Sequence, residues 1–322
     1  MTPGASIELA ARLLGRQCSV ERPITVDQTN LSVVVDEAVV VKWLRPPIPA
    51  PHPGVGLIRY LTESGFDEMP AFLGADERAN MVHAIVTAYL PGALDGWDWY
   101  VDDAEAWLAG RLDLADLVDS ARRMGGIAAR LHSALEDLEP SMVDVRAVAA
   151  QAMTDLRLAT DRLDGLDWLD AQIVAEVLQP LRDAGPVHGH RIHGDLHAGQ
   201  FLRAGEILVV TDFDGNPLQD LGGRARAQSP LGDVASLVQS IEHVGAIVVK
   251  RRRPDRADEV DRFATAATAA ALDAYSAVHT VDHQLLLAFR VAQELHEYAY
   301  SIHHLPHWRY VADAALPRLL GL

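Results

Sequence analysis

The chain has little cysteine, few basic residues and no long apolar run, and each of these deficits excludes a class of protein. Cys18 is the only cysteine in 322 residues, which excludes an internal disulfide and a cysteine-based zinc site and leads us to expect the reducing cytoplasm. The chain carries 28 Lys and Arg against 45 Asp and Glu, a net charge of −17, which argues against nucleic acid and anionic membranes as partners. The first apolar stretch, Ile7 to Leu14, is interrupted by Glu8 and Arg12, so we expect neither a signal peptide nor a membrane span.

The order of hydrophobic patterns predicts two lobes. Residues up to about 90 contain β-type runs, with a hairpin formed by Leu31–Val35 and Ala38–Leu44 and a further strand over Met81–Tyr89. After the break at Leu90-Pro91-Gly92, helical periodicity dominates. The predicted helical segments are Ser120–Leu138, Val234–Val249, Asp258–Val278 and Gln284–His304. We therefore predict an α+β, bilobal chain, with a β-rich N-terminal nucleotide-binding lobe over residues 1–90 and a mainly helical catalytic and acceptor-binding lobe over residues 91–322.

One compound motif carries the chemistry. His193-Gly-Asp-Leu-His-Ala-Gly-Gln200 is followed by the apolar run Ile207 to Val210, which predicts a buried strand, and then by an Asp-Phe-Asp-Gly-Asn-Pro segment that starts at Asp212. Loops at the two ends of a strand can bring Asp195 and Asp212 to one point. Phosphoryl transfer needs one carboxylate to accept the proton of the attacking hydroxyl and another to hold Mg²⁺ against the triphosphate of ATP. His-Gly-Asp alone is typical of many capped loops, but the whole pattern predicts a kinase.

The two loops resemble the catalytic and metal loops of the aminoglycoside phosphotransferase family of small-molecule kinases. Most members have Asn where this chain has Gln200, and Gln followed by Asp-Phe-Asp-Gly-Asn-Pro is similar to the maltokinase branch, most of all to actinobacterial glucosamine kinases. The resemblance implies a protein-kinase-like fold and Asp195 as the catalytic base. It implies Gln200 and Asp212 as Mg²⁺ ligands, and Asp214 as a ligand of a second ion or a contact to the substrate. These are the hard oxygen donors that Mg²⁺ prefers.

The nucleotide half of the site is less regular than in the family. Lys42 is the candidate strand lysine for the phosphates of ATP, with a solvent-facing strand lysine as the alternative. The resemblance implies that the nucleotide lies between the lobes, with Tyr89 and Leu90 in the hinge that faces the base. The segment in the place of a glycine-rich loop, residues 26–30, contains no glycine. Gly56 occupies the position of the helix glutamate that usually pairs with the lysine, so either Lys42 pairs elsewhere or the ion pair is absent.

Two further residues of the motif are assigned to support. His193 is expected to tie the catalytic loop to the metal loop, whereas His197 is equally compatible with packing in its loop. Asp233 resembles the aspartate at a helix start that buttresses the catalytic loop, and a plain helix cap is the alternative. Gly194 stands where protein kinases carry an arginine, and few residues separate the metal loop from Asp233, so we infer a small-molecule acceptor.

The last long helix is the candidate acceptor surface. Its apolar side carries Val291, Leu295 and Ile302, and the adjoining polar side is expected to present Glu294, Glu297 and Tyr298. The following His-His-Leu-Pro-His-Trp308 segment resembles the Arg-Pro-x-Trp end of maltokinases. Carboxylates and aromatic rings on one surface could bind a sugar and its ammonium group. The alternative is a solvated helix face with a packed tryptophan.

Three functions are compatible with the sequence. The leading one is an ATP-dependent kinase, using one or two Mg²⁺ ions, that acts on an amino sugar, most simply glucosamine to glucosamine 6-phosphate. The second is maltokinase-type or aminoglycoside phosphotransfer. The third, from another class, is a pseudokinase-like nucleotide-binding module, suggested by the missing helix glutamate. The presence of Asp195, Gln200 and Asp212 together counts against a module that only binds, because binding needs no base.

Overall fold

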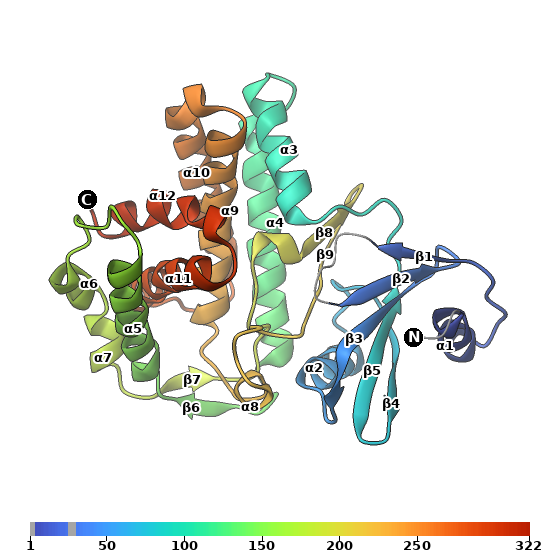
Figure 1. Ribbon diagram of the computed structural model, residues 1–322. Coiled ribbons are helices and arrows are strands. Elements are labelled where there is room, and N and C mark those ends of the chain that lie inside the picture. Colours follow the sequence, from blue (N-terminus) through green and yellow to red (C-terminus); the bar gives the residue numbers. More distant parts are fainter. Residues whose placement is uncertain (1–3, 25–29) are drawn as a thin grey trace. The chain divides into compact units, whose positions relative to one another are not determined.

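The structure is a computed structural model that describes residues 4–24 and 30–322, and the chain divides into two compact units (Figure 1). Unit 1 comprises Met1–Leu94 and Leu202–Ala225, and unit 2 comprises Asp95–Phe201 and Arg226–Leu322. The prediction divided the chain once, at residue 90, whereas the structure returns Leu202–Ala225 to the N-terminal unit. The backbone explains this return, because Arg203 N donates to Leu94 O at 2.9 Å and Val210 N donates to Glu68 O at 2.9 Å.

Unit 1 is built on an antiparallel sheet in the order β1-β2-β3-β5-β4, with a separate ladder between β8 and β9. Its strands are β1 (Glu21–Ile24), β2 (Leu31–Val35), β3 (Val39–Pro49), β4 (Phe72–Arg78), β5 (Met81–Ala88), β8 (Phe201–Ala204, whose first residue falls in unit 2) and β9 (Ile207–Val210). Its helices are α1 (Ala5–Leu14), α2 (Pro53–Glu63) and α8 (Leu221–Arg224). The predicted hairpin, the strand from Met81 and the strand at Ile207–Val210 are confirmed.

The alternation of side chains along β3 decides where Lys42 points. Helix α1 packs Leu9 and Ala10 onto one face of the sheet, where they meet the buried side chains of Val39 and Val41. Since successive side chains of a strand point to opposite faces, Lys42 lies on the face away from α1. The strand therefore holds the lysine on the side that is not filled by the α1 core.

Unit 2 is mainly helical, as Figure 1 shows. Its longer helices are α3 (Gly96–Leu108), α4 (Leu114–Leu135), α5 (Arg146–Arg162), α9 (Leu231–Arg251), α10 (Ala257–Ser276), α11 (His283–His303) and α12 (Tyr310–Leu319). Its shorter elements are α6 (Ala171–Val177), α7 (Gln179–Asp183), the paired strands β6 (Ser141–Val143) and β7 (Val187–Gly189), and the 3₁₀ turns η1 (Ala198–Gln200), η2 (Pro254–Arg256) and η3 (Pro306–Trp308). The predicted helical segments correspond to α4, α9, α10 and α11.

Close helix packing places the core of unit 2. Helices α4 and α10 pack against each other, and α11 packs against α5, α9 and α12. Gly125 of α4 lies so near α10 that a Cβ atom there would be 2.0 Å from Ala271 O, so only glycine fits this crossing. The long helices thereby form a rigid base for the loops at their ends. The predicted α+β architecture, with a β-rich first unit and a helical second unit, is confirmed.

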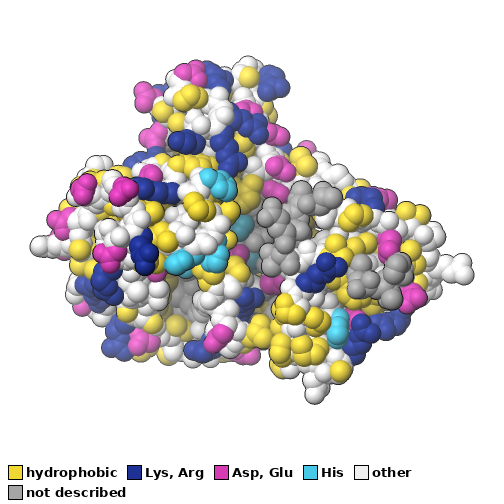
Figure 2. All heavy atoms as spheres, viewed as in Figure 1, with side chains coloured by type: hydrophobic (Ala, Val, Ile, Leu, Met, Phe, Trp, Pro, Cys, Tyr) yellow, Lys and Arg dark blue, Asp and Glu magenta, His cyan; other side chains and the backbone are white. Residues whose placement is uncertain are grey.

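The surface carries charge of both signs. On the face drawn in Figure 2, basic side chains are interspersed with acidic ones over each unit, and no single basic field gathers there. A continuous basic patch is the usual footprint of nucleic acid, and this face does not show one. Within the described residues, no helix is long and apolar enough to cross a bilayer.

Candidate active site

The metal loop, residues Thr211–Pro217, follows β9 in unit 1 and contacts Lys42 directly. Lys42 Nζ lies 2.8 Å from Asp212 Oδ1 and 3.0 Å from Asp214 Oδ2. Burial acts against the charged ammonium, but the negative charges of Asp212 and Asp214 outweigh it and raise the pKa of Lys42. Asp212 has a φ of 61°, in the left-handed region that aspartate tolerates better than most residues. The two carboxylates thus converge on one positive charge.

Lys42 has ionic partners although the helix glutamate that usually pairs with this lysine is missing. Gly56, at the position of that glutamate, is exposed on α2 and would have nothing within 4 Å of an added Cβ atom. Glu63, the nearest acid in the sequence, is exposed at the last position of the helix. Lys42 therefore pairs with the metal loop itself.

Arg224, on α8, fixes the far end of the metal loop and was not identified from the sequence. Its guanidinium donates to Pro217 O at 2.8 Å, to Gln219 O at 3.0 Å and to Asp214 O at 3.3 Å. A planar guanidinium can hold several carbonyl oxygens at once, which orders a turn without a hydrophobic core. No local sequence signal distinguished this arginine from its neighbours.

The predicted hinge residues, Tyr89 and Leu90, directly follow β5. Tyr89 N donates to Ala38 O at 2.8 Å, and Tyr89 Oη accepts a hydrogen bond of 2.8 Å from Arg22, which also binds Glu37. Leu90 is half-buried, and its carbonyl accepts from Ala93 N at 3.2 Å. Of the segment expected to cover the phosphates, residues 26–29 lie outside the described residues.

The catalytic loop, residues His193–Gln200 of unit 2, is anchored on the first turn of α9. Asp233 accepts hydrogen bonds from His193 N at 2.8 Å and from Gly194 N at 2.9 Å. Gly194 has a φ of 82°, which explains a glycine at this position. Further along, Ala198 N donates to Ser240 Oγ of α9 at 2.8 Å. The backbone on both sides of Asp195 is thereby fixed to one helix.

His132 and Tyr275 extend the hydrogen-bond network of Asp233, and neither residue was predicted from the sequence. His132 Nε2 lies 3.1 Å from Asp233 Oδ2, and His132 Nδ1 lies 2.8 Å from Tyr275 Oη. Full burial would favour protonation of Asp233, but the hydrogen bonds from His132 and Gly194 and nearby histidine charge lower its pKa. The weak signal for His132 was its place at the end of the apolar helix pattern of α4.

Asp195 itself is accessible. Its side chain is 34% exposed, and Oδ2 lies 3.9 Å from His197 Nε2, beyond hydrogen-bond range. Asp195 N donates to His193 Nδ1 at 3.3 Å, so the imidazole of His193 forms a hydrogen bond within the catalytic loop. Gln200 Nε2 contacts His197 Nε2 at 3.3 Å, so the amide oxygen of Gln200 is the atom available to a cation.

Helix α3 supports the same loop through an aromatic contact. The ring of Trp97 stacks on His197 at 5.4 Å and meets Trp308 edge-on at 5.7 Å. Gly199 allows this approach, since a Cβ atom there would lie 2.3 Å from Trp97 Nε1. Asp95 caps α3 by accepting from Trp97 N at 2.9 Å. Two tryptophans, Trp97 and Trp308, thus lie beside the loop that carries Asp195, and the sequence predicted only Trp308.

The donor set fits a hard divalent cation. Asp212 and Asp214 place carboxylate oxygens within 3.0 Å of a single ammonium, the arrangement that a cation between two carboxylates requires. Across residues 4–24 and 30–322, no three His, Cys, Asp or Glu side chains gather as a metal site. The two carboxylates of the metal loop match the preference of Mg²⁺ for oxygen ligands.

Two of the predicted acceptor residues are not on a free polar face. Glu294 is 0% exposed, and its Oε1 lies 2.8 Å from His243 Nε2 of α9. Tyr298 is also fully buried and donates to Asp313 Oδ1 at 2.9 Å. The prediction that these two side chains face a sugar is therefore corrected. The physical reason is that α9 and α12 cover this side of α11, so its polar groups are paired inside the unit.

The half-exposed face of α11 instead carries His296, Glu297 and Tyr300. Burial and the negative charges of Glu297 and Asp195 raise the pKa of Tyr300, which places this face within electrostatic reach of the catalytic loop. A hydrogen bond to Asp155 is the main cause of the raised pKa of His296, with Glu297 and Asp195 contributing. His296 and Tyr300 could have been found as the i and i+4 neighbours on the face that includes Glu297.

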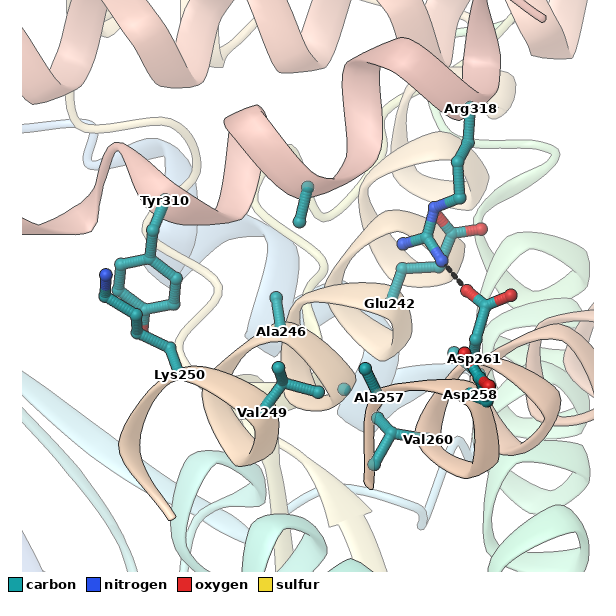
Figure 3. Close-up of a pocket in the computed structure, with 13 residues that line it drawn as sticks. Glu242, Ala246, Val249, Lys250, Ala257, Asp258, Val260, Asp261, Tyr310 and Arg318 are labelled. Atoms are coloured by element: carbon teal, nitrogen blue, oxygen red, sulfur yellow. Dashed lines mark hydrogen bonds and ion pairs between the residues drawn. The ribbon is translucent and has the colours of Figure 1, made fainter. Parts of the chain in front are cut away.

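A separate cavity of about 410 Å³ lies among α9, α10 and α12 (Figure 3). Small residues at the facing positions, such as Gly245, Ala246 and Ala264, leave this space open. At its rim Arg318 forms an ion pair with Asp261. None of the predicted site residues lines this cavity, so it contributes nothing to the candidate active site.

Comparisons with known proteins show which family the chain resembles. No protein-family model matches the chain. A curated glucosamine kinase of Streptacidiphilus jiangxiensis is 37% identical over 342 aligned residues, covering 99% of this chain and 78% of the relative. A glucosamine kinase of Mycolicibacterium smegmatis (strain ATCC 700084 / mc(2)155) is 37% identical over 323 residues, covering 93% of this chain and 79% of the relative.

Solved structures of glucosamine kinases are also similar to this chain. A glucosamine kinase in complex with glucosamine, ADP and inorganic phosphate superposes with a TM-score of 0.85 at 33% identity, covering 99% of this chain and 83% of that one. The GDP complex of an aminoglycoside 2'-phosphotransferase superposes with a TM-score of 0.53 at 11% identity, covering 97% of this chain and 96% of that one, which shows the fold alone. The protein-kinase-like fold is confirmed.

Proposed function

Since the chain belongs to the glucosamine kinase family, we propose that it transfers the γ-phosphoryl group of ATP to glucosamine and forms glucosamine 6-phosphate. The observation that carries this proposal is the carboxylate of Asp195, accessible on a loop whose backbone Asp233 fixes. We also propose a cytoplasmic location, because ATP is the donor and the single cysteine, Cys18, leaves no partner for an internal disulfide.

In the proposed reaction each half of the site has a distinct task. Asp195 accepts the proton of the attacking hydroxyl, which needs a carboxylate that is both ionised and reachable. Lys42 turns its ammonium from the metal loop to the phosphates of ATP. Mg²⁺, when bound by Asp212, Asp214 and Gln200, would neutralise charge that develops on the phosphates. The pairing of Lys42 with both carboxylates supports this, because it brings an oxygen of each within 3.0 Å of one positive charge.

The acceptor is proposed to lie against the half-exposed face of α11. Glu297 supplies negative charge for the C2 ammonium, and the rings of Trp97 and Trp308 offer faces for the sugar. Asp195 must reach the hydroxyl that attacks, so an amine held by Glu297 favours the distant primary 6-OH. The electrostatic coupling of Tyr300 to both Glu297 and Asp195 supports this arrangement.

The pseudokinase alternative loses its main argument. It rested on the missing helix glutamate, but Lys42 has ionic partners in the metal loop. A binding module would also have no use for an accessible carboxylate on an anchored loop. Maltokinase-type and aminoglycoside phosphotransfer are distinguished from glucosamine phosphorylation by substrate alone.

The experiment is a coupled ADP-release screen over glucosamine, glucose, N-acetylglucosamine, maltose and an aminoglycoside. We expect turnover on glucosamine to exceed that on the other acceptors, and we expect it to require Mg²⁺. Turnover of maltose or the aminoglycoside without glucosamine would remove the amino-sugar assignment and leave the kinase assignment. No ADP release above the rate without acceptor, for any of them, would contradict both.

A further inference from the structure

The N-terminal end of α2 lies directly on the metal loop. An added Cβ atom at Gly54 would be 2.7 Å from Phe213 O, 2.9 Å from Asp214 Oδ1 and 3.2 Å from Asp214 Cα. Real Cβ atoms do not come this close to backbone atoms, so glycine is required at this position. The helix therefore reaches the two residues that follow Asp212 without any side chain in between.

His52 fixes the same end of the helix. Its Nδ1 accepts hydrogen bonds from Gly54 N at 3.1 Å and from Val55 N at 3.3 Å, which satisfies two donors of the first turn. The imidazole is almost completely buried. Because Nδ1 is the acceptor, the ring proton of the neutral imidazole is on Nε2. The first turn of α2 is thus held in one orientation where it touches Phe213 and Asp214.

We propose that Gly54 and His52 are positioning residues for the metal loop, so that the contact between α2 and Phe213–Asp214 takes the place of a lysine–glutamate pair. Lys42 binds both carboxylates, and α2 with its capped first turn supports the same loop through Gly54. This inference rests on the proposed function, because it assumes that Asp212 and Asp214 hold the cation. It predicts that the geometry of the metal ligands depends on a residue that contacts neither the cation nor the nucleotide.

The chain contains its own control. Gly54→Ala and Gly56→Ala add the same methyl group to the same helix, but only position 54 faces the metal loop, since nothing lies within 4 Å of a Cβ atom at Gly56. The measurement is the affinity for ADP by isothermal titration calorimetry, with and without Mg²⁺, for the parent and both variants. We expect Gly54→Ala to reduce the Mg²⁺-dependent gain in affinity about tenfold or more, because displaced ligands cannot meet the cation. Gly56→Ala should retain the parent's gain.

The outcomes separate the two proposals. A parent whose ADP affinity does not depend on Mg²⁺ would contradict the metal role of Asp212 and Asp214 in the proposed function. A parent with that dependence, together with equal gains for Gly54→Ala and Gly56→Ala, would overturn the positioning role alone.

A second pair of variants decides the matter if Gly54→Ala does not fold. Asn can accept the same backbone donors as a helix cap, whereas Ala cannot. His52→Asn should therefore retain most of the Mg²⁺-dependent gain in ADP affinity, and His52→Ala should lose several-fold. Equal gains for both, in variants whose thermal unfolding is cooperative, would overturn the role of His52.

Discussion

The catalytic loop and the metal loop are held in opposite ways. Asp233, which anchors the catalytic loop, is buried and accepts from backbone amides and from His132. The metal loop is held by Lys42 and Arg224 at the surface of its unit, and the side chain of Asp212 is 41% exposed. A catalytic base must keep one position, whereas the proposed metal ligands must release the ammonium of Lys42 when they bind Mg²⁺. The difference indicates that fixed geometry is provided by buried backbone contacts, and exchange by partly solvated charges.

The largest expected effect comes from removing the base. Asp195→Asn should lower kcat by roughly 10²–10⁴, the usual contribution of a positioned general base. The fold should persist, because Asp195 is partly exposed and its loop is anchored through Asp233. Steady-state kinetics on glucosamine would show it, with Asp137→Asn, an exposed aspartate of the same unit, as the control. Near-normal turnover of Asp195→Asn would show that another group accepts the proton.

Asp233 and Lys42, which hold the two loops, should differ in their contributions to the free energy of unfolding. Asp233→Asn sets an amide NH₂ against backbone donors in a buried site, so we expect a loss of about 2–4 kcal/mol in the free energy of unfolding. Lys42→Met removes a partly exposed ion pair and should cost less than about 1 kcal/mol. Urea denaturation of both variants tests the comparison. Equal losses would mean that the metal loop is as much a part of the folded core as the catalytic loop.

The sequence predicted the parts whose chemistry is local. The spacing of Asp195, Gln200 and Asp212 around one strand can be recognised without a structure, and the run of β-branched residues Val39–Val41 predicts a strand. The partners of Lys42 could not be predicted in the same way, because the hydrogen bond to Asp212 spans 170 positions and depends on a left-handed turn.

The error at the acceptor face has a similar cause. Periodicity identifies the apolar stripe of α11 but not how many neighbours cover the helix. Glu294 and Tyr298 are buried because His243 of α9 and Asp313 of α12 supply polar partners from distant parts of the chain. Glu297, only one turn away, is half-exposed.

This difference along α11 gives a sharper test of the acceptor site. Glu297→Gln should reduce the preference for glucosamine over glucose by about 10- to 150-fold, since a charge-assisted hydrogen bond contributes roughly 1.5–3 kcal/mol. Glu294→Gln should leave the preference unchanged, because that carboxyl group faces His243 inside the unit. The ratio of kcat/KM for the two sugars is the measurement. An unchanged ratio in Glu297→Gln would move the amine site elsewhere, with the segment Asp95–Asp98 as the next candidate.

The smallest expected effect is a pH dependence of stability that arises at His296, on the half-exposed face of α11. His296 Nδ1 lies 3.5 Å from Asp155 Oδ2, and this contact raises the pKa of His296 above its ordinary value of 6.5. The stabilisation is therefore complete below about pH 6.5 and is lost as the pH rises through the raised pKa. His296→Gln should reduce the free energy of unfolding by about 0.5–1 kcal/mol at pH 6 and less at pH 9. Thermal denaturation at the two pH values checks the direction, and a greater loss at pH 9 would contradict it.

The division of labour between the two loops is tested most directly by Mg²⁺-dependent binding of ADP to Asp195→Asn and Asp212→Asn. Calorimetric titration of each variant, with and without Mg²⁺, separates metal binding from catalysis. We predict that Asp195→Asn binds ADP with the parent's Mg²⁺ dependence. In Asp212→Asn the Mg²⁺-dependent gain in ADP affinity should fall about tenfold, because a metal ligand loses its charge. Equal Mg²⁺ dependence in the two variants would contradict the assignment of the base to one loop and the metal to the other.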